Sequence, residues 1–154
     1  SLGGQTLTEL RASLAQAETE VTGGLSPRVA PMAEIRDLGA LLQRAGFALP
    51  VADCLPLSVS YETAFHLMND LKAMGERNAL AARQKSFTRR AVFQKAAEIY
   101  HSNFRDGDRI KATFELIFMT GWAPDSSQPK PLRPGSADQR LADALGTKES
   151  SLPD

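Results

Sequence analysis

The chain has 154 residues, 42% hydrophobic and 23% charged, a composition typical of one globular domain with one core. Its 18 basic side chains balance 18 acidic ones, so the net charge argues against nucleic acid or an anionic membrane as a partner. The single cysteine excludes an internal disulfide and a multi-cysteine zinc site and favours a cytoplasmic location, and no apolar run reaches the ~20 residues that span a bilayer.

Two helices joined by a loop are predicted for the first part of the chain. Thr6 and Glu9 have the spacing of a capping box, and leucines at helical spacing predict a helix over about residues 6–20. Two prolines four residues apart make 25–31 an extended loop. The apolar periodicity then resumes and predicts a second helix over 32–45.

The middle of the chain predicts a strand followed by a helix. Residues 47–61 alternate between apolar and other side chains, and the interruptions at Pro50 and Pro56 indicate an edge strand. Cys54 lies in this strand with no histidine nearby in sequence, so we expect a small buried apolar group and not a nucleophile. Helical periodicity returns over 62–74.

The second half predicts one further helix and a final apolar strand. The polar stretch 76–90 contains a basic run, which either meets phosphates or forms a solvated surface, the commoner arrangement. A helix is predicted around residues 92–100 and a turn over 105–108. Residues 114–124 are almost continuously apolar, which is typical of a strand buried on both faces in the middle of a sheet.

The chain loses its periodicity after this strand. We therefore divide it into a folded part, 1–123, and an extended, proline-rich and partly disordered tail, 124–154. Trp122 stands at the junction, and two hypotheses fit it equally: it packs over the edge of the core, or it covers a cleft or binds a partner.

Motifs for catalysis and cofactor binding are absent from the sequence. There is no Gly-x-Gly-x-x-Gly and no Gly-x-x-x-x-Gly-Lys, so the loops that hold nucleotide phosphates are missing. His66 and His101 stand alone on separate predicted helices, which gives no metal pair. Asp70 is more simply a surface carboxylate than an acid or base. We assign no catalytic residue, no metal site and no cofactor site to this chain.

Guanidinium groups cluster in sequence around the first loop. Arg11, Arg28 and Arg36 surround the restricted backbone of Ser26-Pro27. One hypothesis is a clamp for a carboxylate or for a partner peptide. The other is a set of salt bridges that tie the loop to helix ends, which is the commoner arrangement.

Several separate blocks of sequence share one resemblance. They are Gly3–Arg11, Ala17–Glu20, Gly23–Arg28, Asp37–Phe47, Met68–Glu76 and Gly121–Trp122 with Ser136–Ala137. In this order the blocks resemble one group of class I methyltransferase-like proteins, the alphaproteobacterial biotin-synthesis methyltransferase homologues and the mitochondrial relatives that assist assembly of respiratory complex I. The resemblance covers residues 3 to about 140.

The resemblance implies the C-terminal part of a Rossmann-like α/β fold, with helices and an antiparallel pair of strands. Gly3-Gly4 would close strand five, 47–61 would be strand six, and 110–122 would be strand seven, inserted between five and six. In this family S-adenosylmethionine lies against the first four strands, which have no counterpart here. We therefore expect no cofactor and no activity from this chain alone, and S-adenosylmethionine in a full-length parent.

Within the family the C-terminal half shapes the acceptor side of the cleft. The substrate-side residues implied by position are Arg11, Ser26, Pro27, Arg28, Arg36, Tyr61, Asp70, Met74 and Trp122. The preferred hypothesis is a substrate-side fragment of a methyltransferase that acts on a protein or carrier-bound substrate. The alternatives are a non-catalytic assembly module that binds a respiratory subunit, and a free-standing helical binding domain. We also expect a homo-oligomer such as a dimer, formed through an open sheet.

Overall fold

The computed structural model describes residues 1–128 and 145–146. The chain divides into two compact units, 1–123 and 124–154. In the second unit the carboxylate of Asp125 accepts hydrogen bonds from the backbone N–H and hydroxyl of Ser127, at 2.9 and 2.7 Å. The predicted disorder toward residue 154 and the block Ser136–Ala137 lie outside the described residues. All further description concerns the first unit.

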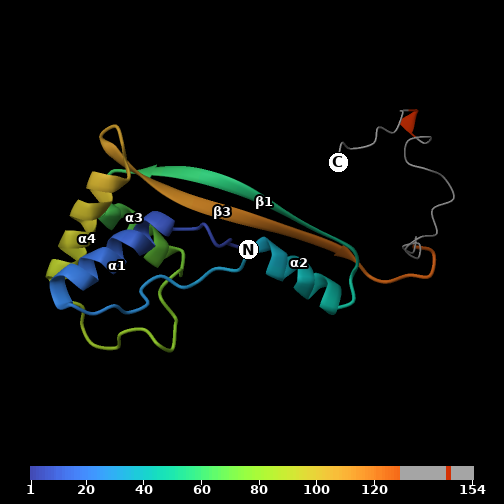
Figure 1. The fold of residues 1–154 in the computed structure, drawn as a ribbon, viewed down its shortest axis with the longest axis horizontal. Coiled ribbons are helices and arrows are strands. Elements are labelled where there is room, and N and C mark those ends of the chain that lie inside the picture. Colours follow the sequence, from blue (N-terminus) through green and yellow to red (C-terminus); the bar gives the residue numbers. More distant parts are fainter. Residues whose placement is uncertain (129–144, 147–154) are drawn as a thin grey trace, which may run out of the picture. The chain divides into compact units, whose positions relative to one another are not determined.

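The first unit contains four helices and three strands among its described residues (Figure 1). In chain order they are α1 (Thr8–Thr22), α2 (Ile35–Arg44), β1 (Ala48–Tyr61), α3 (Ala64–Ala73), α4 (Arg90–Asn103), β2 (Arg105–Asp106) and β3 (Arg109–Trp122). The α/β class predicted from the sequence is confirmed, and the longer elements lie close to their predicted positions. The basic stretch between α3 and α4 contains no helix and is mostly exposed.

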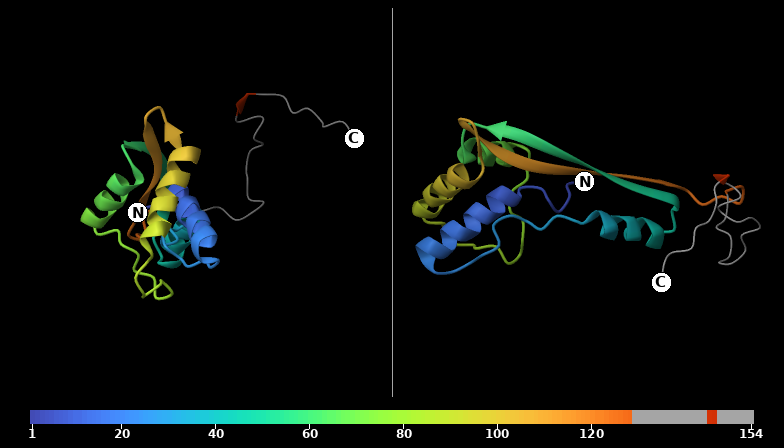
Figure 2. Two further views of the ribbon diagram at one scale, coloured as in Figure 1. Left: turned by 90° about the vertical axis from the view of Figure 1, so that its left-hand side faces the viewer. Right: turned by 45° about the horizontal axis from the view of Figure 1, so that its top comes forward.

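The three strands form one antiparallel sheet in the order β1-β3-β2. The pairing of β1 with β3 runs from Ala48 opposite Trp122 to Tyr61 opposite Ile110, with a register shift between Ala48 and Val51. Figure 2 shows this pair as a long twisted ribbon. β1 lies at the edge of the sheet, as its two prolines predicted, because a proline has no N–H to donate to a second neighbour.

The first three residues run along the edge of β3 that β1 does not occupy. The amino group of Ser1 donates to the carbonyl of Ile117 at 2.9 Å, and the Ile117 N–H donates to the Ser1 carbonyl at 2.8 Å. The N–H of Gly3 donates to the carbonyl of Glu115 at 2.8 Å. Leu2 thereby forms an antiparallel bridge to Leu116. β3 thus has backbone neighbours on both sides, as expected for a central strand.

The start of α1 corrects the predicted capping box. The hydroxyl of Thr6 donates to the Glu115 carbonyl at 3.3 Å and accepts from the Glu115 N–H at 3.0 Å. The buried carboxylate of Glu9 accepts from the N–H of Thr113 at 3.1 Å and from its hydroxyl. Both side chains therefore bind β3 and not the helix end, because buried strand N–H groups need an acceptor. The cap position is Leu7, in a left-handed conformation with φ of 58° and no side-chain cap.

The core lies between α1, α3, α4 and the end of the sheet near Ile110. Its largest buried side chains include Tyr100, Leu67 and Val92. The hydroxyl of Tyr100 donates to the carbonyl of Lys111 at 2.9 Å, so the buried phenol is satisfied.

The far half of the hairpin is open, which corrects two predictions. β3 was predicted to be buried on both faces, but Phe118 is 55% and Trp122 50% exposed. Cys54, predicted to be buried, is exposed on β1. The reason is the same for both strands. The helical core gathers at the Ile110 end, and α2 stands near the opposite end (Figures 1 and 2).

Candidate functional site

A buried ion pair holds the loop that follows α1. Gly23 ends the helix with φ of 71°. The chain then returns along the helix, so Arg28 Nη2 lies 2.5 Å from Glu18 Oε1 and Nε lies 3.1 Å from Oε2. The backbone N–H and the hydroxyl of Ser26 donate to the same carboxylate, at 2.9 and 2.8 Å. The side chains of Arg28 and Glu18 are only 13% and 6% exposed.

The same arginine connects this loop to the segment before α4. Arg28 Nη1 donates to the hydroxyl of Thr88 at 2.7 Å, and Nη2 donates to Gln84 Oε1 at 2.7 Å. The side-chain amide of Asn78 donates to the carbonyl of Pro27 at 2.7 Å. The guanidinium is therefore engaged by internal partners. This geometry corresponds to the salt-bridge hypothesis and not to an open carboxylate clamp.

The charge of Glu18 is stabilised by its surroundings. Burial acts to raise the pKa of this carboxyl group, but hydrogen bonds from Arg28 and Ser26 and the positive charge of Arg28 lower it. The net effect is a pKa below the usual value. At neutral pH the pair is fully ionised, as a short charge-assisted contact requires.

Two other candidate residues, Tyr61 and Asp70, are in contact. The Tyr61 hydroxyl lies beside the Asp70 carboxylate, and burial together with that negative charge raises the pKa of Tyr61. Tyr61 ends β1 and Asp70 lies on α3, so this contact links the two elements. Arg11 is separate from this contact, and its Nη2 donates to the carbonyl of Thr6 at 3.4 Å.

The remaining candidates are scattered over exposed positions. Arg36 lies on the solvent side of α2, Met74 is 57% exposed just after α3, and Trp122 ends β3. Within residues 1–128, no hydrogen bond or ion pair joins any of these three to another candidate. The structure thus places Ser26 and Arg28 on one carboxylate and Tyr61 beside Asp70, but it does not build one site from all nine predicted residues.

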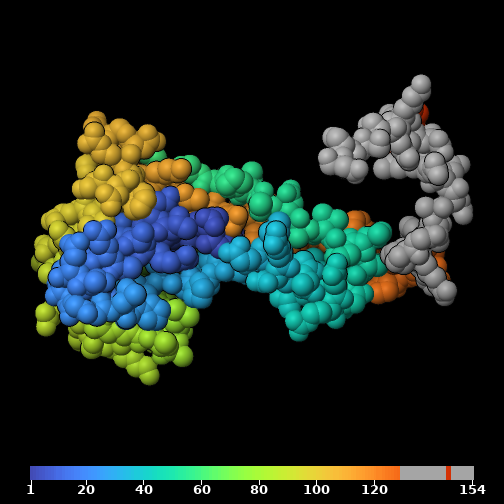
Figure 3. Space-filling view, in the orientation of Figure 1, coloured from blue at the N-terminus to red at the C-terminus, as the bar shows by residue number. Residues whose placement is uncertain are grey.

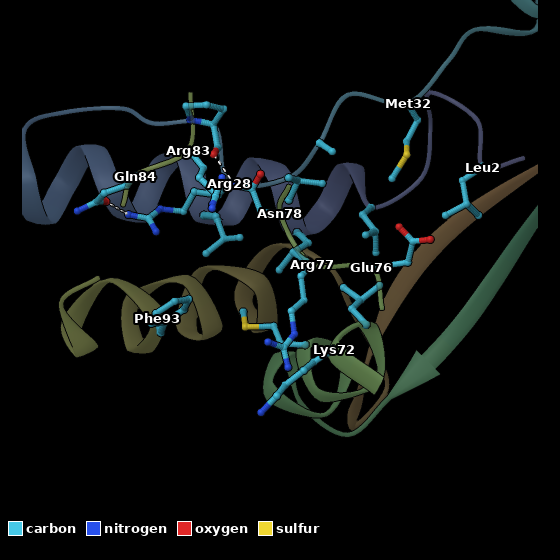
Figure 4. Close-up of a pocket in the computed structure, with 18 residues that line it drawn as sticks. Leu2, Arg28, Met32, Lys72, Glu76, Arg77, Asn78, Arg83, Gln84 and Phe93 are labelled. Atoms are coloured by element: carbon cyan, nitrogen blue, oxygen red, sulfur yellow. Dashed lines mark hydrogen bonds between the residues drawn. The ribbon is translucent and has the colours of Figure 1, made fainter. Parts of the chain in front are cut away.

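A cavity of about 390 Å³ opens between α1, α3, α4, the loop that follows α1 and the segment between α3 and α4 (Figure 4). Its lining is mainly apolar, with leucines from α1, Leu71 from α3 and Phe93 from α4. Pro27 and Arg28 are the predicted residues that line it. Lys72 and Arg77, two exposed cations that line the cavity, were not predicted, since exposed lysines and arginines are common on any surface. Glu18 was also missed, although a carboxylate four residues after Leu14 on an apolar helix face indicates a buried partner.

The described residues were also compared with the requirements of a metal site and of a membrane-spanning helix. Among the residues that the structure describes, no three histidine, cysteine, aspartate or glutamate side chains gather as a metal site would require. None of the described helices is both long enough and apolar enough to cross a bilayer.

Comparison with known proteins identifies relatives in both groups named by the sequence resemblance. The chain is 43% identical over 152 residues to the mitochondrial arginine-hydroxylase NDUFAF5 of Homo sapiens, and 41% identical over 147 residues to that of Dictyostelium discoideum. It is 36% identical over 126 residues to a malonyl-[acyl-carrier protein] O-methyltransferase of Methylovorus sp.. These alignments cover 98%, 94% and 82% of this chain. Both groups are homologues of the chain, and the predicted resemblance is confirmed.

The chain spans less than half the length of these relatives: 44%, 34% and 40% of the three proteins, respectively. No protein-family model matches the chain. The NDUFAF5 relatives are mitochondrial by name, so they give no support to the cytoplasmic location expected for this chain, which stays a prediction.

Proposed function

We propose that this chain is the C-terminal, substrate-side part of a methyltransferase-like protein that uses S-adenosylmethionine. The observation that carries the proposal is the pairing of Ser1–Gly3 along β3, on the side opposite β1. The last strand is antiparallel to both neighbours. This is the arrangement that the resemblance implies for strand seven between strands five and six.

Under this proposal the segment that ends at Gly3 is the close of strand five, β1 is strand six and β3 is strand seven. The segment runs close to β3 at Gly3, because a Cβ atom there would lie against the side chain of Glu115. The Glu115 carboxylate also accepts a hydrogen bond from the N–H of Gln5 at 3.2 Å. The end of the strand and the start of α1 are therefore packed against β3 by both backbone and side chain.

The substrate class follows from the relatives by analogy. Their names specify an arginine for one group and a malonyl group on an acyl-carrier protein for the other. We propose that the full-length parent acts on a protein or a carrier-bound substrate, and that this chain contributes residues to the acceptor side and none to the cofactor site. The chain alone would then be inactive.

Calorimetric titration with S-adenosylmethionine tests this proposal. The 154-residue chain is compared with the longer polypeptide encoded by the intact reading frame, at equal concentrations. We expect binding by the longer protein and none by the chain. Saturable binding by the chain alone would overturn the assignment, and failure of both would favour a parent that does not use this cofactor.

A second candidate function is a non-catalytic assembly module that binds a respiratory subunit. The observation in its favour is the exposed apolar face of the hairpin, where Leu55 is 47% and Phe118 55% exposed. The same face supports the expected homo-oligomer. Sedimentation at micromolar concentration should then show a dimer that Phe118→Lys dissociates, whereas Ser58→Lys, on the other face of the same hairpin, should leave it intact. A monomeric unmodified chain would count against self-association.

A further inference from the structure

The cavity beside α1 combines an apolar interior with a positively charged opening. Leu10 and Leu14 are almost fully buried, and Met68 and Phe93 pack partly against the same core. An interior of this kind excludes water and favours a ligand with hydrocarbon surface. The volume of about 390 Å³ lies within the usual range for small-molecule sites.

The charges that line the cavity do not cancel. Arg28 is neutralised by Glu18, which leaves Lys72, Arg77 and Arg83 against the single acid Glu76. The Lys72 and Arg77 side chains extend to the same side of the pocket, whereas the Glu76 side chain extends toward Leu2 and Met32 (Figure 4). Across residues 1–128 and 145–146, neither Lys72 nor Arg77 forms an ion pair.

We infer that this cavity binds an acyl chain that carries a negatively charged group. The apolar lining would hold the hydrocarbon, and Lys72 and Arg77 would hold the anion at the opening, where both remain hydrated when the site is empty. Charge complementarity decides between substrate classes, since the same opening repels the guanidinium of an arginine. The inference rests on the proposed function in one respect: it assigns the substrate side a preference for an acyl group over an arginine side chain.

NMR of the methionine methyl groups detects ligand binding in this cavity. The chain contains four methionines, of which Met32 and Met68 line the cavity and Met74 and Met119 do not. The methyl groups are labelled with carbon-13 and assigned by single Met→Leu variants. Decanoate, kept below its micelle-forming concentration, is expected to shift the Met32 and Met68 signals saturably. The other two signals should stay unmoved.

Two comparisons test the role of charge. Decyltrimethylammonium has the same chain with the opposite charge and should bind at least about tenfold more weakly. The variant Lys72→Gln/Arg77→Gln should raise the Kd for decanoate about three- to tenfold, since both cations are exposed and partly screened by water. The matched control Arg44→Gln/Arg105→Gln removes two exposed cations that do not line the cavity and should leave the Kd unchanged.

Figure 3 shows α1, in blue, on the surface that faces the viewer. A substitution that fills the cavity tests whether the ligand occupies it. Ala30, half-buried in the loop that lines the cavity, is replaced by tryptophan to fill the space. Decanoate should then no longer shift Met68. Retained binding in Ala30→Trp, equal binding of both amphiphiles, equal shifts of all four methionines, or no shift at all would each overturn the inference. None of these titrations requires S-adenosylmethionine, so their failure is distinct from failure of the proposed function.

Discussion

The ion pair between Glu18 on α1 and Arg28 in the following loop leads to a prediction about the stability of the chain. Glu18→Gln keeps the shape of the side chain but removes its charge. The oxygen that remains can still accept from Ser26, whereas the opposing Nη2 and Nε groups of Arg28 lose an ionised acceptor. Because Arg28 is 13% exposed, water compensates for only part of that loss.

We expect Glu18→Gln to lower the free energy of unfolding by about 2 kcal/mol. Breaking a fully buried ion pair costs about 3–5 kcal/mol, and a hydrogen bond to a charged group contributes about 1.5–3 kcal/mol. The lower part of this range applies, since the pair lies at the edge of the core and the glutamine retains one acceptor. For a chain of this length the change corresponds to a fall in Tm of roughly 4–8 °C.

Urea unfolding followed by circular dichroism at pH 7 measures this change. The matched control is Glu20→Gln, two residues further along α1, where the carboxylate pairs with Lys95 at 3.3 Å and both side chains are about two-fifths exposed, at 43% and 40%. Water screens that pair, so the control should have a much smaller effect. The reasoning is refuted if the two substitutions destabilise the chain equally.

The pH dependence gives a second test of the same pair. The pKa of Glu18 is lower in the folded chain than its ordinary value, so its stabilising contribution is present above that ordinary value. The contribution is lost as the pH falls through the folded pKa, where a protonated glutamate resembles glutamine. The gap between the unmodified chain and Glu18→Gln should therefore close at acid pH. A gap that persists unchanged at about pH 3 would contradict an ionic origin.

Three further predictions concern single groups. Tyr100→Phe should cost about 1–2 kcal/mol in urea unfolding, because it leaves the Lys111 carbonyl without its 2.9 Å partner; no measurable loss would mean that water replaces the hydroxyl. Thr63→Ala should cost about 1 kcal/mol, since the Thr63 hydroxyl accepts from the N–H of His66 at the start of α3, and Thr63→Ser should restore most of it. Cys54 should react with Ellman's reagent almost as fast in the native chain as in urea; strong protection would show that another surface covers β1.

The sequence predicted those features of the fold that depend on local patterns. Alternation and prolines located β1 and its position at the edge. Periodicity also predicted that the helix ends at about residue 74, and Gly75, with φ of 84°, follows α3 there. The capping box failed for a non-local reason. Thr6 and Glu9 have the right spacing, but β3 offers them buried backbone partners more than a hundred residues away. No local pattern contains that competition.

Only the part of the candidate site that depends on neighbouring residues in sequence could be predicted. Ser26 and Arg28 are close in sequence to the helix end that they contact, so a clustered interaction was foreseeable. Their partners Gln84 and Thr88 come from the basic stretch before α4, which has no periodicity of its own. The cavity depends on how α1, α3 and α4 cross, and the spacing of apolar residues within each helix does not determine that packing.

The exposure of β3 shows why an apolar strand can be predicted correctly and still be misjudged in burial. Alternate residues from Ile110 to Phe118 share one face of the hairpin, and their exposure rises from 1% at Ile110 to 55% at Phe118. On the opposing strand exposure rises in the same direction, from 37% at Val59 to 54% at Val51. The apolar pattern continues along this face after the helical cover has ended. A strand's composition therefore specifies the surface that needs a cover, whereas its burial depends on which element or partner supplies one.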